Sequence, residues 1–344
     1  MARRALLYFS FGGPDGPEDV LPFMQNVTRK RPVPPERLVE VSRHYHLFGG
    51  RSPINSINLE LINRIRHALD ASGTDLPVYF GNRNWSPYLG DTLRQMGDDG
   101  VEEALVFVTS AYGSYSGCRQ YRDDLAEALA DSANPQIRLF KLRHFYDHPR
   151  FVEPFAQGAA DAFTRLAEVH GASAVRVLYT AHSIPTAMAA NSEYLLQLGL
   201  VRDYVNARLG AVTGVRPDSA QVYQSRSGPP SQPWLEPDIS DAMAQMHAAG
   251  ARAFVVIPIG FISDHMEVVY DLDTLAASTA RDLGAGFARV ATPSSSAGFE
   301  QLVLDLVREI ENPGFAAPSL PMPLKPVQEC QAGCCMPGYV PRSL

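Results

Sequence analysis

The sequence predicts an α/β fold of two Rossmann-like domains, each a four-stranded parallel sheet flanked by helices, with the active cleft between them. Short apolar runs rich in β-branched residues alternate along the chain with longer stretches of helical spacing, a pattern typical of parallel sheets with right-handed crossovers. Eight such runs occur, and they divide into two groups of four near residue 148. A chain of 344 residues is long enough for two domains with a sizeable core.

The apolar runs and the helical spacing set the expected elements. Strands are expected at residues 5–10, 78–81, 104–110, 137–142, 175–181, 221–224, 253–260 and 288–291. Helices are expected at 17–26, 55–71, 88–96, 119–131, 149–170, 193–209, 237–249, 266–283 and 296–311. We expect the last helix to pack back on the first half, so that residues 1–148 with 296–320 form the N-terminal half and 149–295 the C-terminal half. Residues 321–344 form a cysteine-bearing tail, because they are rich in proline and lack apolar periodicity.

Composition limits the classes of function. A net charge of −7 argues against a nucleic-acid binder, which needs a basic face to neutralise phosphates. The most apolar stretch, residues 253–262, is too short to cross a bilayer, so no transmembrane segment is expected. The start of the chain reads as a first strand rather than a signal peptide. We therefore expect a cytoplasmic protein with reduced thiols.

The most informative segment is GFISDHMEVVYDLD, residues 260–273. It places Asp264, His265, Glu267 and Asp271 just after a buried strand, where open α/β sheets bind ligands. Such a cluster can attract a divalent cation or move protons. The alternative is a helix start capped by Ser263 or Asp264, with Glu267 in a capping box. That alternative leaves His265 and Asp271 unexplained.

A second histidine motif, TAHSIP, follows the strand VRVLYTA. It places His182 at the carboxyl end of a strand, where an imidazole that titrates near neutral pH is suited to general-base work. A structural histidine is the alternative. Ser183 lacks a nucleophile elbow, which argues against a serine hydrolase.

Three loop motifs have both a functional and a structural interpretation. Arg226, in QSRSGPP, could pair with a ligand carboxylate or equally form a structural salt bridge. Ser52, in FGGRSPI, is most simply a helix cap, although the glycines and aromatic residues beside it also suit a flat apolar ligand. Residues 110–121 form either a flexible surface loop or a ligand contact.

The four cysteines are Cys118, Cys330, Cys334 and Cys335. They could be thiols with no special role, but four thiolates also match a tetrahedral zinc site or an iron–sulfur cluster, and their spacing does not choose between these. Either metal site would order the proline-rich tail by tying it to the loop at Cys118.

Five segments together resemble the ferrochelatases, enzymes that insert ferrous iron into a porphyrin and have a class II chelatase-like fold. They are SFGGP (10–14), FGGRSPIN (48–55), AHSIP (181–185), QSRSGPPSQPWLEPD (224–238) and GFISDHMEVVYDLD (260–273). The loop SYSGCRQY (114–121) and the cysteine tail are similar to the actinobacterial branch. That branch makes iron coproporphyrin III and commonly carries a 2Fe–2S cluster.

The resemblance implies a role for each candidate residue. His182 and Glu267 are the implied catalytic pair and bind the Fe²⁺ substrate; Ser52 and Tyr121 match porphyrin contacts. Phe11, where some Gram-positive relatives have a tyrosine that reaches the metal, cannot ligate iron and is expected to contact the porphyrin. The implied polar path to the site contains Asp264, His265 and Asp271, although Leu275 interrupts its acidic run; the implied cluster ligands are Cys118, Cys330, Cys334 and Cys335.

The implied substrates are coproporphyrin III and Fe²⁺, with a monomeric enzyme and transient contact with other haem-pathway enzymes. Arg226 and the basic run 29–31 are candidates for contacts to the propionates. Coproporphyrin has four carboxylates and protoporphyrin two, so coproporphyrin needs more cationic contacts. The alternatives are a protoporphyrin IX ferrochelatase, a cobalt or sirohydrochlorin chelatase of the same fold, and a non-enzymatic haem carrier or redox sensor.

Overall fold

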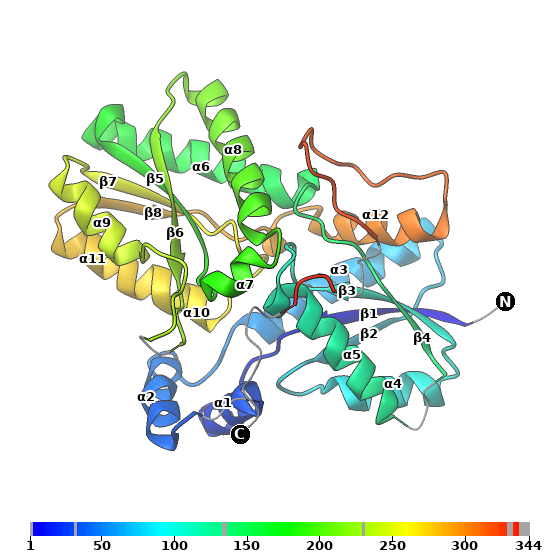
Figure 1. Ribbon diagram of the computed structural model, residues 1–344. Coiled ribbons are helices and arrows are strands. Elements are labelled where there is room, and N and C mark those ends of the chain that lie inside the picture. The colour runs from blue at the N-terminus through cyan, green and yellow to red at the C-terminus, as the bar shows by residue number, and fades with distance from the viewer. Residues whose placement is uncertain (1–2, 31–32, 133–135, 229–230, 329–332, 337–344) are drawn as a thin grey trace.

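The computed structural model describes residues 3–30, 33–132, 136–228, 231–328 and 333–336. Within these residues, eight strands form two four-stranded parallel sheets of equivalent order, β2-β1-β3-β4 and β6-β5-β7-β8 (Figure 1). The predicted α/β class with two Rossmann-like halves is confirmed. The strands are β1 (Arg4–Ser10), β2 (Val78–Asn82), β3 (Glu103–Val108), β4 (Arg138–Lys141), β5 (Val175–His182), β6 (Asp218–Gln224), β7 (Ala253–Ile257) and β8 (Gly286–Arg289).

Helices cover both faces of the first sheet, as the alternation of buried side chains in β1 shows. Leu6 and Tyr8 face the core shared with α3 (Ile54–Ser72) and α12 (Phe299–Glu311). The intervening residues face a second cluster with α4 (Leu89–Asp98) and α5 (Gln120–Ala130). Because successive side chains of a strand point to opposite faces, a strand buried on both sides reads as a continuous apolar run.

The second sheet is covered in the same way. Val177 and Tyr179 of β5 face the core shared with α6 (Pro149–His170) and α8 (Tyr194–Thr213). Leu178 faces the opposite side, which is covered by α9 (Ile239–Ala248) and by the helix that begins at Met266. That helix, expected as one regular element, contains three parts: α10 (Met266–Val268), the π-helical η4 (Val269–Ala276) and α11 (Ala277–Asp282).

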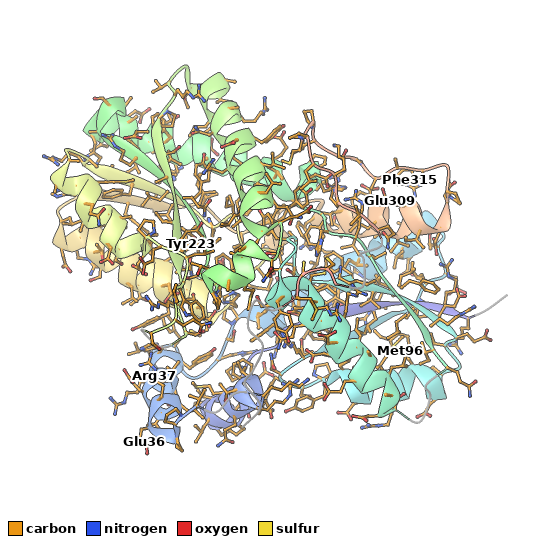
Figure 2. All side chains as sticks on the ribbon, viewed as in Figure 1. Glu36, Arg37, Met96, Tyr223, Glu309 and Phe315 are labelled. Atoms are coloured by element: carbon orange, nitrogen blue, oxygen red, sulfur yellow. The ribbon has the colours of Figure 1, made fainter. Side chains whose placement is uncertain are left out.

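Two helices were missed by the sequence analysis. They are α2 (Pro35–His46), which pairs with α1 (Val20–Thr28), and the short α7 (Thr186–Ala190). Helices α1 and α2 form a small apolar cluster of their own, built on Val20, Phe23, Met24 and Leu38. In Figure 1, α2 extends towards the second half, where His44 stacks on Tyr270 with ring centroids 4.1 Å apart. The outer side of α2 is polar, and Figure 2 shows Glu36 and Arg37 at the edge of the molecule.

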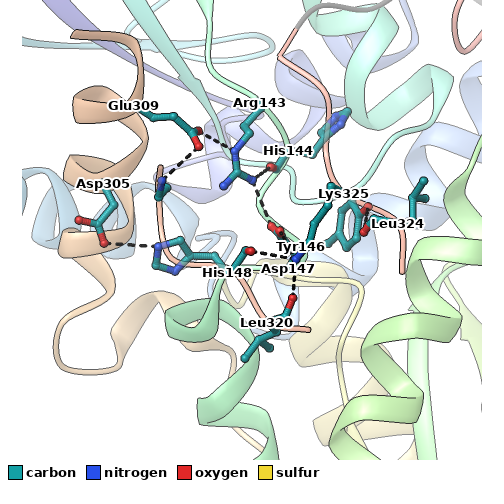
Figure 3. A network of polar contacts seen from close by, with 12 residues as sticks. Arg143, His144, Tyr146, Asp147, His148, Asp305, Glu309, Leu320, Leu324 and Lys325 are labelled. Carbon is teal, nitrogen blue, oxygen red and sulfur yellow. Dashed lines mark hydrogen bonds and ion pairs between the residues drawn. The ribbon is translucent and has the colours of Figure 1, made fainter. Parts of the chain in front are cut away.

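The chain crosses from the first half to the second between β4 and α6, and the C-terminal segment docks on this crossing (Figure 3). Arg143 Nε lies 2.7 Å from Glu309 Oε2, and Arg143 Nη1 lies 3.1 Å from Asp147 Oδ1. The backbone N–H of Leu320 donates to the Asp147 carbonyl at 2.7 Å. The Tyr146 hydroxyl donates to the carbonyl of Leu324 at 3.0 Å. The proline-rich segment is therefore anchored to the crossing at Leu320 and Leu324.

None of the described helices combines the length and the apolar character that a bilayer crossing requires.

Candidate active site

A cleft of about 430 Å³ lies where the carboxyl ends of strands from both sheets meet. The segments that follow β1, β3, β5 and β7 all contribute to its wall, in keeping with the rule that α/β sheets bind ligands at this edge. Much of the wall is aromatic, as a flat apolar ligand requires. The aromatic residues that line it are Phe11, Phe23, Tyr45, Tyr112, Tyr121, Tyr194, Trp234 and Phe261.

His182 is the last residue of β5, and the structure determines which of its ring nitrogens faces the ligand. Its Nδ1 lies 2.6 Å from the backbone carbonyl of Ser183. A carbonyl can only accept a hydrogen bond, so Nδ1 carries the proton in the neutral ring. The lone pair is therefore on Nε2, which faces Glu267 on the other side of the cleft. The hydroxyl of Tyr194 donates to the His182 carbonyl at 3.1 Å and helps to fix the end of the strand.

His182 and Glu267 form a facing pair, with Nε2 and Oε2 3.5 Å apart. Their side chains are 34% and 47% exposed, and this exposure is to the cleft that both line. Burial alone would lower the pKa of His182, but the hydrogen bond and charge of Glu267 outweigh it and raise the pKa above the ordinary value. Burial alone would raise the pKa of Glu267, yet the contact with His182 lowers it. The pair thus favours an imidazolium beside a carboxylate.

The three residues of the expected polar path have different surroundings. His265 lines the cleft beside Phe261, and burial lowers its pKa, so it is neutral near pH 7. Asp271 accepts hydrogen bonds from Ser225 and Gln224, and burial raises its pKa to about 6. Asp264 binds both terminal nitrogens of Arg289 at 3.1 Å and accepts from Thr292, and it is not among the described residues that line the cleft.

The same contacts decide against the helix-cap interpretation of this segment. The N-cap of α10 is His265, and its side chain makes no capping hydrogen bond. Asp264 is bound to Arg289, and the Ser263 hydroxyl donates to Ser294 at 2.9 Å. The alternative in which Ser263 or Asp264 caps the helix is therefore wrong, because both side chains have partners outside α10.

Three of the four expected porphyrin contacts line the cleft: Ser52, Tyr121 and Phe11. Ser52 is buried, and it does not cap α3, whose N-cap is Pro53 with no side-chain hydrogen bond. The fourth, Arg226, is not among the described lining residues; its Nη1 lies 3.4 Å from Glu236 Oε1 on the surface.

The loop that carries Tyr121 is not a flexible surface loop, as one interpretation had it. Residues Tyr115–Arg119 form a π-helical turn, η2, that leads into α5, and Cys118 within this turn is buried. The Ser114 hydroxyl accepts from the backbone N–H of Gly117 at 2.9 Å and caps the turn. The loop is thus a folded part of the cleft wall.

Comparison with known proteins agrees with this geometry. Residues 3–311 match the family model described as Ferrochelatase. The chain belongs to the ferrochelatase family. A protein of Mycolicibacterium smegmatis named coproporphyrin III ferrochelatase is 49% identical over 313 residues, covering 90% of each chain. Proteins of the same name from Frankia alni and Streptomyces coelicolor are 48% and 47% identical over 97% and 98% of this chain, and 86% and 94% of theirs.

A solved structure supports the fold alone. SirB from Bacillus subtilis, solved with Fe³⁺, aligns with a TM-score of 0.50 and 10% identity over 92% of this chain and all of the other. The ferrochelatase fold and the chelatase-like architecture expected from the sequence are therefore confirmed.

The described cysteines lie in two places along the chain. Cys118 is buried in η2, and Cys335 is buried with its Sγ 3.5 Å from Sγ of Cys334. Cys330 lies outside the described residues. Among the described residues no three histidine, cysteine or acidic side chains are grouped as metal ligands.

Several cleft residues were not predicted, and Arg83 is the clearest. It directly follows β2, so the rule that located His182 at the end of β5 also points to it. Tyr45 lies in α2, which was not predicted, and Phe23 lies in α1, which was predicted as a helix but not as part of the cleft. Trp234 belongs to a quoted motif but was not singled out; its ring packs against Gly228, where a Cβ would lie 2.3 Å from it.

Proposed function

We propose that this ferrochelatase inserts Fe²⁺ into coproporphyrin III and releases iron coproporphyrin III. The observation that carries the proposal is the facing pair of His182 and Glu267 in an aromatic cleft between the two halves. The relatives at 46–49% identity that are named coproporphyrin III ferrochelatase support the choice of porphyrin.

The reaction removes two pyrrole protons and strips water from the ferrous ion. In this proposal His182 accepts protons at Nε2, the nitrogen that its hydrogen bond to Ser183 leaves unprotonated. Glu267 stabilises the imidazolium that results and offers carboxylate oxygens to the incoming iron, and His265 adds a neutral imidazole at the same wall. The macrocycle would lie against the aromatic wall, with Ser52, Tyr121 and Phe11 as its contacts.

The test is anaerobic Fe²⁺ insertion followed by absorption spectra, with coproporphyrin III and protoporphyrin IX assayed in parallel. We expect turnover with a higher kcat/KM for coproporphyrin III. A preference for protoporphyrin IX would keep the enzyme class and replace the substrate. No insertion into either porphyrin, combined with tight haem binding, would contradict the proposal and favour a carrier or sensor.

We also propose that Cys118, Cys330, Cys334 and Cys335 bind a 2Fe–2S cluster. The close approach of Cys334 Sγ and Cys335 Sγ and the burial of Cys118 fit a thiolate site, and the docked segment before residue 328 brings the tail to the first half. The cluster would supply an ordering link for the tail. A brown protein with sulfide-to-iron charge-transfer bands and two irons per chain is expected; a colourless protein with stoichiometric zinc would refute the cluster.

A further inference from the structure

One corner of the cleft carries a concentrated positive charge. Among the described residues that line the cleft, Arg29, Lys30 and Arg83 are the only lysine and arginine side chains. We call this set the cationic corner. All three surround one carboxylate, that of Asp124, which is 6% exposed. Its Oδ2 lies 2.5 Å from Arg83 Nε, and its Oδ1 lies 3.4 Å from Lys30 Nζ and 3.9 Å from Arg29 Nη2.

The acids that pair with the cationic corner lie outside the cleft. Asp124 and Glu127, which also pairs with Lys30, do not appear among the described lining residues of the cleft. They line a neighbouring hollow of about 350 Å³ between α1, α4 and α5. Arg29 and Arg83 line both spaces. Three cations against two carboxylates leave one positive charge in excess, and the cationic side faces the cleft.

The two arginine side chains of the corner are fixed by contacts with the protein. Arg29 Nη1 donates to the Asn26 carbonyl at 2.8 Å and to Asn84 Oδ1 at 2.9 Å, which leaves Nη2 directed to Asp124. The side chain of Arg83 is 7% exposed, and its guanidinium carbon lies 5.3 Å from the centre of the Tyr121 ring and 5.9 Å from that of Phe11. A buried arginine needs a counter-charge, and Asp124 supplies it.

We propose that Asp124 is a positioning residue that holds the cationic corner as the binding site for a side-chain carboxylate of the porphyrin. The inference rests on the proposed function for the identity of the ligand. Among the described lining residues, this corner alone offers arginine and lysine side chains to an anionic ligand. The corner therefore determines the orientation of the macrocycle. In this proposal, the affinity of the corner for a porphyrin carboxylate depends on the positions of the guanidinium groups rather than on the total charge.

Asp124→Asn tests this, because positioning and net charge predict opposite results. The substitution keeps the shape and adds one net positive charge to the corner. If charge alone mattered, porphyrin would bind more tightly. If Asp124 positions the cations, the Kd for metal-free coproporphyrin III, measured by fluorescence quenching, rises about fivefold or more. In turnover, KM rises by a similar factor while kcat stays within about twofold.

Asp123→Asn is the matched control, since Asp123 is the preceding residue of α5 and pairs with Arg119 outside the cleft; its Kd should equal that of the wild type. Arg29→Gln covers the case in which Asp124→Asn fails to fold, because Arg29 is 39% exposed. It should also raise the Kd. In the double variant Arg29→Gln/Asp124→Asn, the Kd should rise by less than the product of the two single-variant factors. An unchanged or lower Kd in Asp124→Asn, or an unchanged Kd in Arg29→Gln, would overturn the proposal.

These outcomes are separable from failure of the proposed function. Absence of iron insertion by the wild type would contradict the function. The corner is judged from the ratio of variant to wild-type Kd for whichever of coproporphyrin III and protoporphyrin IX the wild type binds, in the absence of iron.

Discussion

Nε2 of His182 and Oε2 of Glu267 face each other across 3.5 Å, although 85 positions of the chain separate the two residues. One ends β5 and the other lies in the first turn of α10, after β7. Strands β5 and β7 are hydrogen-bonded neighbours in the second sheet, so their carboxyl ends bring the two side chains together. The pair is thus a direct product of the sheet order.

Replacement of His182 by alanine should abolish insertion. Loss of a general base lowers turnover by about 10²- to 10⁴-fold. We expect kcat for Fe²⁺ insertion to fall in this range, with the circular dichroism spectrum and unfolding midpoint close to wild type. His67→Ala, on the exposed side of α3, is the control and should be fully active. Wild-type turnover in His182→Ala would rule out the assigned role.

Glu267→Gln should move the pH dependence of the reaction. Glu267 raises the pKa of His182, and only the neutral imidazole accepts a proton, so wild-type kcat/KM should increase as pH rises through that raised pKa. Without the carboxylate the pKa of His182 falls, and the acidic limb of the profile should shift to lower pH. The same interaction also makes stability depend on pH. Its contribution to the free energy of unfolding is fully present below the unfolded pKa of His182 and is lost as pH rises through the folded pKa. An acidic limb at the same pH in both proteins would show that His182 does not control it.

Asp271→Asn should stabilise the protein at neutral pH. Burial raises the pKa of this carboxyl to about 6, so its ionisation at pH 7 opposes folding. An amide removes that cost, and the gain in free energy of unfolding should be up to about 3 kcal/mol at pH 7. The gain should shrink as pH falls from about 6 towards the ordinary carboxyl pKa, because the folded state is then protonated and the unfolded state becomes increasingly so. Urea unfolding at pH 7 and pH 4.5 measures it.

The exposed Asp282, at the end of α11, provides the control for that experiment. Asp282→Asn should change the free energy of unfolding by less than about 0.5 kcal/mol at either pH. A loss of stability in Asp271→Asn at pH 7 would mean that the hydrogen bond from Ser225 outweighs the burial of the charge.

Arg143→Met should destabilise the crossing between the two halves. Asp147 is 1% exposed, and without Arg143 its described cationic partner is Lys325, at 4.0 Å. Removing one partner of a buried pair costs about 3–5 kcal/mol in free energy of unfolding. Arg202→Met, which removes a surface pair with Asp203, should cost less than about 1 kcal/mol. Addition of Asp147→Asn to Arg143→Met should restore part of the loss; no restoration would show that the uncompensated charge is not the cause.

Much of the fold was predictable because the strands are buried on both faces. Leu6 to Phe9 and Phe254 to Ile257 are fully buried, so each strand is a continuous apolar run. The rule that ligands bind at the carboxyl ends of parallel strands then located His182 and Glu267 correctly in space. The helix α2 was missed because prolines surround its start and its long polar face weakens the apolar period.

Other parts of the site depend on contacts that local sequence does not record. The π-helical η4 has the same composition as a regular helix, and only its hydrogen bonds distinguish it. Ser52 and Asp264 stand where caps are common, but Ser52 precedes the N-cap Pro53 and lines the cleft, and Asp264 binds Arg289 instead. The convergence of Arg29, Lys30 and Arg83 on Asp124 joins α1, the end of β2 and α5, and no single segment contains it.

The docking of the C-terminal segment on residues 143–148 extends the packed structure of the first half beyond the end of the family match. The family match stops at residue 311, yet Tyr146, Asp147 and Glu309 all have backbone partners between residues 317 and 324. A chain shortened to the family boundary would expose Tyr146 and Asp147 to the solvent on one side of the crossing. The Asp147 carbonyl would lose its donor and the Tyr146 hydroxyl its acceptor. For recombinant work, a chain that extends at least to Lys325 keeps these contacts, and a C-terminal tag is best placed beyond it.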